Sequence, residues 1–183
     1  MPRLIDHWLV AGRLEFKTKA ISNFRAHESQ YAELISAFRT ANKTLPPCGL
    51  PGPIVGTVEF RAFAVKPDRS YRVVIHGDGT VVPSLQEAAR TLNTDAATIQ
   101  TLAGALKAVD RPGIYQSGAT VSIPIEDGSS YGVLFVPASC RVAANFESWS
   151  RNGSSSDVPL TDGGSYANLF ALGNGWYYYL AWR

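Results

Sequence analysis

The sequence lacks the features that mark secreted, membrane-spanning and strongly charged proteins. It holds two cysteines, Cys48 and Cys140, among 183 residues. Two cysteines are too few for a disulfide framework, and two buried free thiols are favoured over a single bridge. No apolar run reaches the roughly 18 residues of a membrane span, and Asp6 and His7 interrupt the N-terminal stretch where a secretory signal needs an apolar core. We therefore expect a soluble protein without a signal peptide.

Catalytic and metal-binding motifs are also missing. The sequence contains no GxSxG, no phosphate-cradling glycine loop and no HExxH. His76 and Asp78 form an HxD pair, but zinc needs three or four protein ligands and no second cluster follows. Cys140 with His76 could be posed as nucleophile and base, yet a lone cysteine in an apolar strand is more often buried and inert. We expect no catalytic residue, cofactor or metal and no enzyme; a Cys- or metal-dependent hydrolase is the third alternative.

The charge balance leaves the binding partner open. The formal net charge is +2 at pH 7, and the sequence pI is about 8.6. These values are too mild to indicate a nucleic-acid-binding protein from net charge.

Apolar alternation with a period of two recurs along the chain. It predicts a hairpin of two strands at residues 4–10 and 13–20, with one solvated face. The period then changes, since apolar residues at helical spacing predict a short amphipathic helix over residues 29–39, with Ser29 as its N-cap.

The rest of the chain combines one helical pair with many strands. Ser84 and Glu87 form a capping box, and Thr94 or Asp95 restarts a second helix, which predicts a helical pair over residues 84–109. Loops are expected at residues 45–53, which are rich in proline, and at the polar residues 151–157. Further strands are predicted at residues 58–64, 71–75, 119–125, 131–136, 141–149, 166–172 and 176–182.

The aromatic run at residues 176–182 is the most unusual local pattern. On a strand, Trp176 and Tyr178 share one face, while Tyr177 and Tyr179 share the other. A strand that is apolar on both sides is expected between two layers of the core. The alternative is an exposed surface for a sugar, a lipid or a neighbouring subunit.

The order of strands and helices resembles that of the viral jelly-roll coat proteins. In that family eight strands form two facing sheets, with short helices inserted after the second and fourth strands, and the slots here are residues 29–39 and 84–109. The resemblance implies a mainly β (α+β) fold: an antiparallel two-sheet sandwich with inserted helices in one domain, residues 1–183. It also implies a non-enzymatic structural protein of the virion, whose partners are copies of itself in a symmetric assembly.

If the chain is a coat protein, viral nucleic acid is a further partner. Arg13, Lys17, Lys19 and Arg25 could then line an inner surface and contact phosphates. The alternative is that these four residues belong to the solvated face of a strand. Many coat proteins of this family neutralise genome charge with a disordered, arginine-rich N-terminal segment. Such a segment is not expected here, because the first strand is predicted from Leu4.

The segment 71–125 also resembles a LysM module, a βααβ unit that binds N-acetylglucosamine polymers or serves as a joint in phage tails and baseplates. The residues that carry it are YRV from Tyr71, GDGT from Gly77, SLQEAARTLNTDAATIQTLAG, and IYQSGATVSIP. Two core helices between strands explain the same periodicity. The resemblance implies a glycan groove in which one turn faces one loop, with the residues Gly77, Asp78, Gly79, Thr80, Gly113, Ile114 and Tyr115.

Overall fold

A computed structural model gives the structure of the chain. It describes residues 3–42, 62–75, 79–117, 120–126, 129, 131–138, 158–159, 165–166 and 168–180. For residues 3–14, 117, 158–159, 165–166 and 168 it describes the backbone alone. The described helices are α1 (Arg3–Ala26), α2 (Glu28–Ala41), α3 (Leu85–Thr91) and α4 (Ala96–Ala108).

One large antiparallel sheet joins most of the described strands. Its eight strands run in the order β3-β2-β1-β4-β5-β6-β10-β9, and every neighbouring pair is antiparallel. These strands are β1 (Ala62–Val65), β2 (Tyr71–Val74), β3 (Thr80–Val82), β4 (Gly113–Ser117), β5 (Thr120–Pro124), β6 (Tyr131–Phe135), β9 (Asn168–Gly173) and β10 (Trp176–Leu180). A second, two-stranded sheet pairs β7 (Val158–Pro159) with β8 (Ser165–Tyr166).

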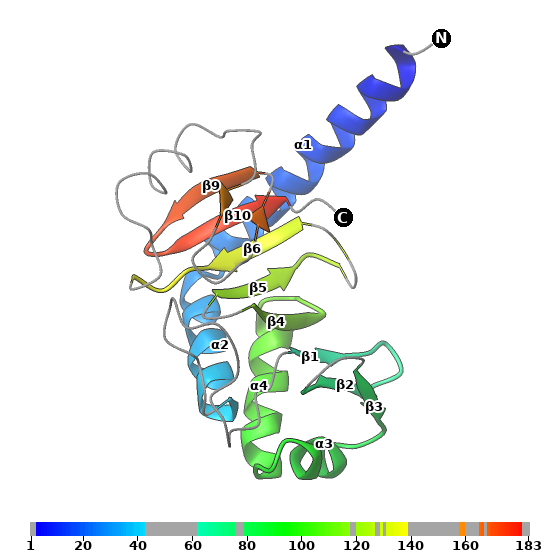
Figure 1. The fold of residues 1–183 in the computed structure, drawn as a ribbon, viewed down its shortest axis with the longest axis vertical. Coiled ribbons are helices and arrows are strands. Elements are labelled where there is room, and N and C mark those ends of the chain that lie inside the picture. The colour runs from blue at the N-terminus through cyan, green and yellow to red at the C-terminus, as the bar shows by residue number, and fades with distance from the viewer. Residues whose placement is uncertain are drawn as a thin grey trace.

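The fold is therefore α+β and rich in β structure, as expected. Eight of the described strands lie in one sheet, so the described residues do not show the two facing sheets of a jelly roll. In Figure 1, α2 and α4 lie side by side beneath the strands, and the N-terminal half of α1 projects away from the sheet.

The predicted hairpin at residues 4–10 and 13–20 is wrong, because both segments lie within the single helix α1. The alternation of apolar and charged residues there also fits a helical period. Phe16, Ala20 and Phe24 recur every four residues and turn toward the sheet, with Ala20 and Phe24 buried. Glu15 and Lys19 form an i,i+4 ion pair of 2.7 Å on the exposed surface.

The helix predicted over residues 29–39 is confirmed as α2, with a different start. Its N-cap is His27 rather than Ser29, and the Ser29 hydroxyl donates to the side-chain oxygen of Gln30 over 2.9 Å. The predicted apolar positions, including Leu34 and Phe38, are buried. The hydrophobic face was thus read correctly from the spacing, and only the cap was misplaced.

The predicted helical pair is confirmed together with both of its caps. The Ser84 hydroxyl accepts from the backbone N–H of Glu87 over 3.2 Å, and the Asp95 carboxylate accepts from that of Thr98 over 2.8 Å. The Glu87 carboxylate bonds Arg90 over 3.0 Å instead of closing the capping box. A side-chain N-cap therefore fixes the first turn of both α3 and α4.

Most of the other predicted strands are confirmed within a few residues. They are found as β1, β2, β5, β6, β9 and β10, whereas β3 and β4 were not predicted as strands. The segments predicted at residues 45–53, 141–149 and 151–157 lie outside the described residues. The order of the strands in the sheet does not follow their order in the chain, since β1 lies between β2 and β4.

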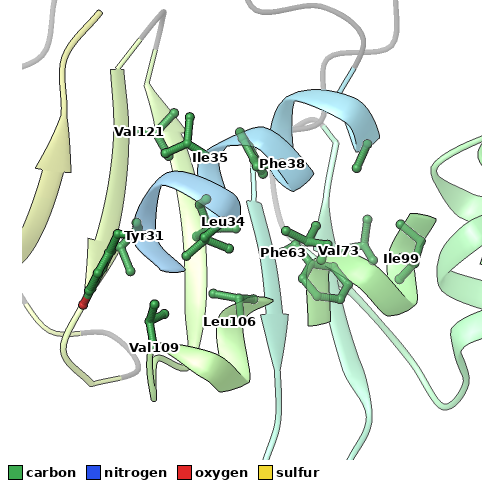
Figure 2. Close-up of a cluster of buried hydrophobic side chains, with 14 of the residues drawn as sticks. Tyr31, Leu34, Ile35, Phe38, Phe63, Val73, Ile99, Leu106, Val109 and Val121 are labelled. Atoms are coloured by element: carbon green, nitrogen blue, oxygen red, sulfur yellow. The ribbon is translucent and has the colours of Figure 1, made fainter. Parts of the chain in front are cut away.

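The helices cover one face of the sheet, which we call the helix face. Figure 2 shows buried residues of β1, β2 and β5 meeting α2 and α4 there, and Ile114 of β4 belongs to the same cluster. The helix face contributes Phe63, Val73, Ile114 and Val121, and the helices contribute Tyr31, Leu34, Ile35, Phe38, Ile99, Leu102 and Leu106. Burying each of these side chains contributes about 1.5 to 3 kcal/mol.

We predict that Leu102→Ala destabilises the fold by about 2 to 5 kcal/mol, because it opens a cavity where α4 meets the sheet. Leu102 is fully buried in α4. The neighbouring exposed change Gln100→Ala should alter stability by less than about 0.5 kcal/mol. Urea denaturation followed by circular dichroism measures both, and equal midpoints for the two variants would contradict this packing.

Candidate functional site

The four predicted phosphate contacts lie on α1, not on a strand. The ammonium of Lys17 lies 3.2 Å from the centroid of the Phe170 ring, and desolvation by burial lowers its pKa. Lys19 is paired with Glu15. Arg25 lies in the last turn of the helix and is exposed.

These four positions do not form one basic surface. Successive residues of a helix are rotated by about 100°, so Arg13 and Lys17 share one side of α1, while Lys19 and Arg25 point elsewhere. The structure therefore does not bring the predicted phosphate contacts together.

Two strands, β2 and β1, separate the two sides of the predicted glycan groove, which lie at β3 and β4. Thr80 is opposite Val73, Val73 is opposite Phe63, and Phe63 is opposite Ile114. Three strand spacings place Thr80 about 14 Å from Ile114. Ile114 is fully buried on the helix face and cannot contact a ligand in solvent.

Three other residues of that predicted groove lie on the far face of the sheet, away from the helices. A Cβ atom at Gly113 would lie 3.2 Å from the ring of Tyr115, which is half-buried. Gly79 packs against β2, where a Cβ atom would lie 2.6 Å from Nε of Arg72. β1 lies between them, and its residue Ala64 on the far face is buried.

The remaining candidates lie outside the described residues: Gly77, Asp78, His76, Cys48 and Cys140. Within the part of the chain that the structure describes, no group of three or more His, Cys, Asp or Glu side chains could hold a metal ion.

A groove of about 540 Å³ opens between α2 and the ends of β6 and β10. Ile35, Phe135 and Trp176 supply its apolar lining. Glu28 and Arg39 lie on its rim, about 16 Å apart along α2 at 1.5 Å per residue. The groove thus combines an apolar floor with one carboxylate and one guanidinium.

Both charged groups of the rim are held in place. The side-chain amide of Asn174 donates to the Glu28 carboxylate over 3.2 Å. The guanidinium carbon of Arg39 lies 5.3 Å from the centroid of the Phe135 ring, within the range of a cation–π contact. Asn174 adopts a φ of 51° in the tight β9–β10 turn.

An aromatic cluster supports the groove from beneath, and two of its rings, Phe135 and Trp176, line the groove. The Trp176 ring centroid lies 5.3 Å from that of Phe24, 5.5 Å from that of Tyr31 and 5.0 Å from that of Phe135. Tilted and edge-to-face rings at these distances contribute beyond their buried area. The floor is therefore rigid.

A hydrogen-bond network fixes the corner between α1 and α2. The Tyr31 hydroxyl donates to the side-chain oxygen of Asn23 over 2.7 Å and accepts from Nε of Arg111 over 2.9 Å. The Asn23 amide donates to the backbone carbonyl of Val109 over 3.2 Å. Burial raises the pKa of the Tyr31 hydroxyl, and the nearby Arg111 charge opposes that shift.

The second candidate site is the N-terminal half of α1, residues 3–14, which we call the arm. It projects beyond the sheet in Figure 1. Just after the arm, the Phe16 ring stacks on that of Tyr131 with centroids 4.5 Å apart. At helical spacing, the apolar residues of the arm are spread around the helix: Ile5 and Leu9 fall on the side of Phe16, whereas Leu4, Val10 and Leu14 fall on other sides. Sequence reasoning missed the arm because it assigned these residues to strands.

Comparisons with known proteins find no match: no protein-family model, no curated protein and no solved structure is similar to this chain. Of the helices described, none has the length and apolar character needed to span a membrane. The two candidate sites must therefore be interpreted from their own chemistry.

We predict that Tyr31→Phe lowers stability by about 1 to 3 kcal/mol, because Asn23 and Arg111 each lose a partner. The difference in stability between wild type and Tyr31→Phe should become smaller at high pH. The pKa of Tyr31 is raised in the folded state, so its contribution is complete below about pH 10, the value of a free tyrosine, and falls as pH rises through the folded pKa.

Chemical denaturation from pH 7 to pH 11 measures this difference. Tyr71→Phe, which removes a hydroxyl from a half-buried tyrosine outside the network, serves as the control. A difference between wild type and Tyr31→Phe that stays constant over this range would contradict the assigned role of burial.

Proposed function

We propose that the chain is a non-enzymatic structural protein that acts by symmetric self-association. The observation that carries the proposal is the arm, a helical segment rich in apolar residues that extends beyond the sheet. A helix of this length is marginal in water by itself, and most helical stability comes from packing apolar residues. We therefore expect a partner, a second copy of the chain, to cover the arm.

The groove supports a binding role rather than a catalytic one. Its lining combines aromatic rings with a single carboxylate and a single guanidinium at opposite ends. General acid–base or nucleophilic catalysis needs reactive groups within hydrogen-bond reach of one another. Glu28 and Arg39, about 16 Å apart along α2, are too distant for that.

The particular form that we propose is a coat protein of a virus-like particle. Closed assemblies use many copies of one chain, and each contact between copies is modest. Two features support this form: the β-rich fold and the arm, which can reach from one copy to the next. Phosphate contact is left out of the proposal, because the four basic residues on α1 do not form one surface.

Self-association predicts a mass that rises with protein concentration. Leu9→Arg should reduce it strongly, because a charge among the apolar residues of the arm would be buried on association. Gln100→Arg adds the same charge at an exposed position of α4, away from the arm, and should have little effect. Light scattering after size exclusion measures the mass, and negative-stain microscopy tests for particles. A homogeneous monomer at every concentration and salt condition would contradict the proposal.

A glycan-binding or tail-joint protein is the second candidate. It is favoured by the Tyr115 ring, which lies half-buried on the far face beside Gly113. If this surface binds a sugar, Tyr115→Ala should lose retention on chitin or peptidoglycan, because stacking on the ring is lost. Pull-down measures retention, with Tyr71→Ala as the matched aromatic control. Equal retention of wild type and Tyr115→Ala would remove this candidate.

A further inference from the structure

The outer edge of β9 is one of the two margins of the large sheet. Among the described strands, β9 pairs with β10 alone. A register shift beside Trp176 and Tyr177 confines the regular part of this ladder to residues 168–171. Residues 168–171 include no charged residue and no proline. Natural proteins blunt a sheet edge with charges, prolines or bulges, so this part of β9 is unprotected.

The opposite margin of the sheet is formed by β3. This strand has three residues, and Pro83 follows it directly. A short strand that ends at a proline offers few backbone groups to a further strand. Of these two outer strands, β9 is therefore the one that suits the addition of a strand.

Hydrogen bonds in the neighbouring ladder show which way the backbone of β9 is turned. The N–H of Val136 donates to the carbonyl of Gly175 over 2.8 Å, so Gly175 directs its carbonyl to β6. Alternate residues of a strand turn their backbone groups to opposite sides, so Tyr178 of β10 directs its own to β9. Phe170 is opposite Tyr178 and therefore directs its N–H and C=O groups to β10.

The residues on either side of Phe170 direct their backbone groups to the outer edge. These residues are Leu169 and Ala171. Ala171 is exposed, whereas Ala62 and Ala64 in the interior strand β1 are buried. Solvent thus reaches β9 at a residue whose backbone N–H and C=O point outward.

We propose that two copies of the chain join their sheets by pairing β9 with β9 about a two-fold axis at Phe170. This inference rests on the proposed function, self-association, and names one contact between the copies. The axis makes the new pair antiparallel, like every neighbouring pair in the sheet. Leu169 of each copy then exchanges hydrogen bonds with Ala171 of the other, which uses both outward residues.

A second copy fits this edge because a strand edge is complementary to itself. Each strand supplies both N–H donors and C=O acceptors. The lack of charges in residues 168–171 matters equally, since a two-fold axis brings equivalent residues together and like charges there would repel. Phe170 of each copy is opposite Phe170 of the other, and aromatic cross-strand pairs are favourable.

The pair should be weak by itself. Residues 168–171 span about 13 Å, and two such strands bury less than the roughly 1,200 to 2,000 Å² of a stable interface. The Lys17 ammonium lies over the Phe170 ring, so two positive charges approach each other across the axis and oppose the pair. We expect a reversible dimer, strengthened where further contacts hold the copies together.

Proline at position 171 tests the backbone pairing. Ala171→Pro removes an N–H that points outward, so the hydrogen bonds between β9 and β10 remain. The dissociation constant of the dimer should rise about tenfold or more, because the removed N–H leaves a carbonyl of the other copy without its donor. Ala171→Thr keeps the N–H and suits a strand, so its constant should stay within about threefold of wild type. Analytical ultracentrifugation measures both, and urea denaturation checks that both variants fold.

The outcomes separate the strand pair from the proposed function. Dimers as stable in Ala171→Pro as in wild type overturn the strand pair but leave self-association intact. Equal weakening by Ala171→Pro and Ala171→Thr also overturns it, because the N–H would then be irrelevant. A wild-type chain that stays monomeric at every concentration overturns both proposals.

Disulfide trapping tests the register without proline. In a Cys48→Ser, Cys140→Ser background, Phe170→Cys should cross-link the dimer rapidly, because opposite residues without mutual hydrogen bonds have Cα atoms about 4.5 Å apart. The two copies of Ala171→Cys should lie about 8 Å apart, beyond the roughly 7 Å that a disulfide allows. Cross-linking at neither position, or at position 171 as fast as at position 170, would overturn the strand pair.

Discussion

The Trp176 indole lies among three aromatic rings that come from α1, α2 and β6, all with centroids 5.0 to 5.5 Å away. This contact joins the two ends of the chain. β10, near the C-terminus, lies between β6 and β9, and Trp176 at its start meets Phe24 and Tyr31 of the N-terminal helices. Each buried ring contributes about 1.5 to 3 kcal/mol. Without this cluster the N-terminal helices would lose their main anchor on this half of the sheet.

The same strand is buried on both faces. Trp176 and Tyr178 face the helices, while Tyr177 and Tyr179 lie on the far face, with Tyr177 opposite Leu134. These four aromatic residues are at most 5% exposed. A run of aromatic residues without a polar face is what such a strand requires. The alternation of the run predicted a buried strand, and burial on both faces confirms it.

How much of the fold the sequence determines depends on the range of the interactions. Ser84 and Asp95 are recognisable because a cap bonds a backbone N–H only three residues away. The helix face of α2 follows from its spacing alone. The position of β1 between β2 and β4 depends on contacts between distant segments, which no local pattern encodes. That insertion separates the residues of the predicted glycan groove.

The error at α1 has a different cause. Residues 13–20 alternate in polarity, which is the pattern of a strand. Over so short a stretch, however, apolar residues four apart, such as Phe16 and Ala20, also fit one side of a helix, so the pattern does not distinguish the two. The spacing of Phe16, Ala20 and Phe24 and the Glu15–Lys19 pair could have favoured the helix.

One continuous helix also changes what the N-terminus can do. A hairpin would have ended at the sheet, whereas α1 carries the arm about 18 Å beyond its packed half. The direction of the arm is set where α1 is held, by Phe16 on Tyr131 at one point and by Asn23 and Tyr31 at the corner with α2. Because the arm acts as a lever, a small rotation at that corner moves its tip by several times as much. The position of the arm relative to the sheet is therefore defined only if the corner is rigid. The buried network around Tyr31 thus contributes to the proposed self-association as much as the arm itself does.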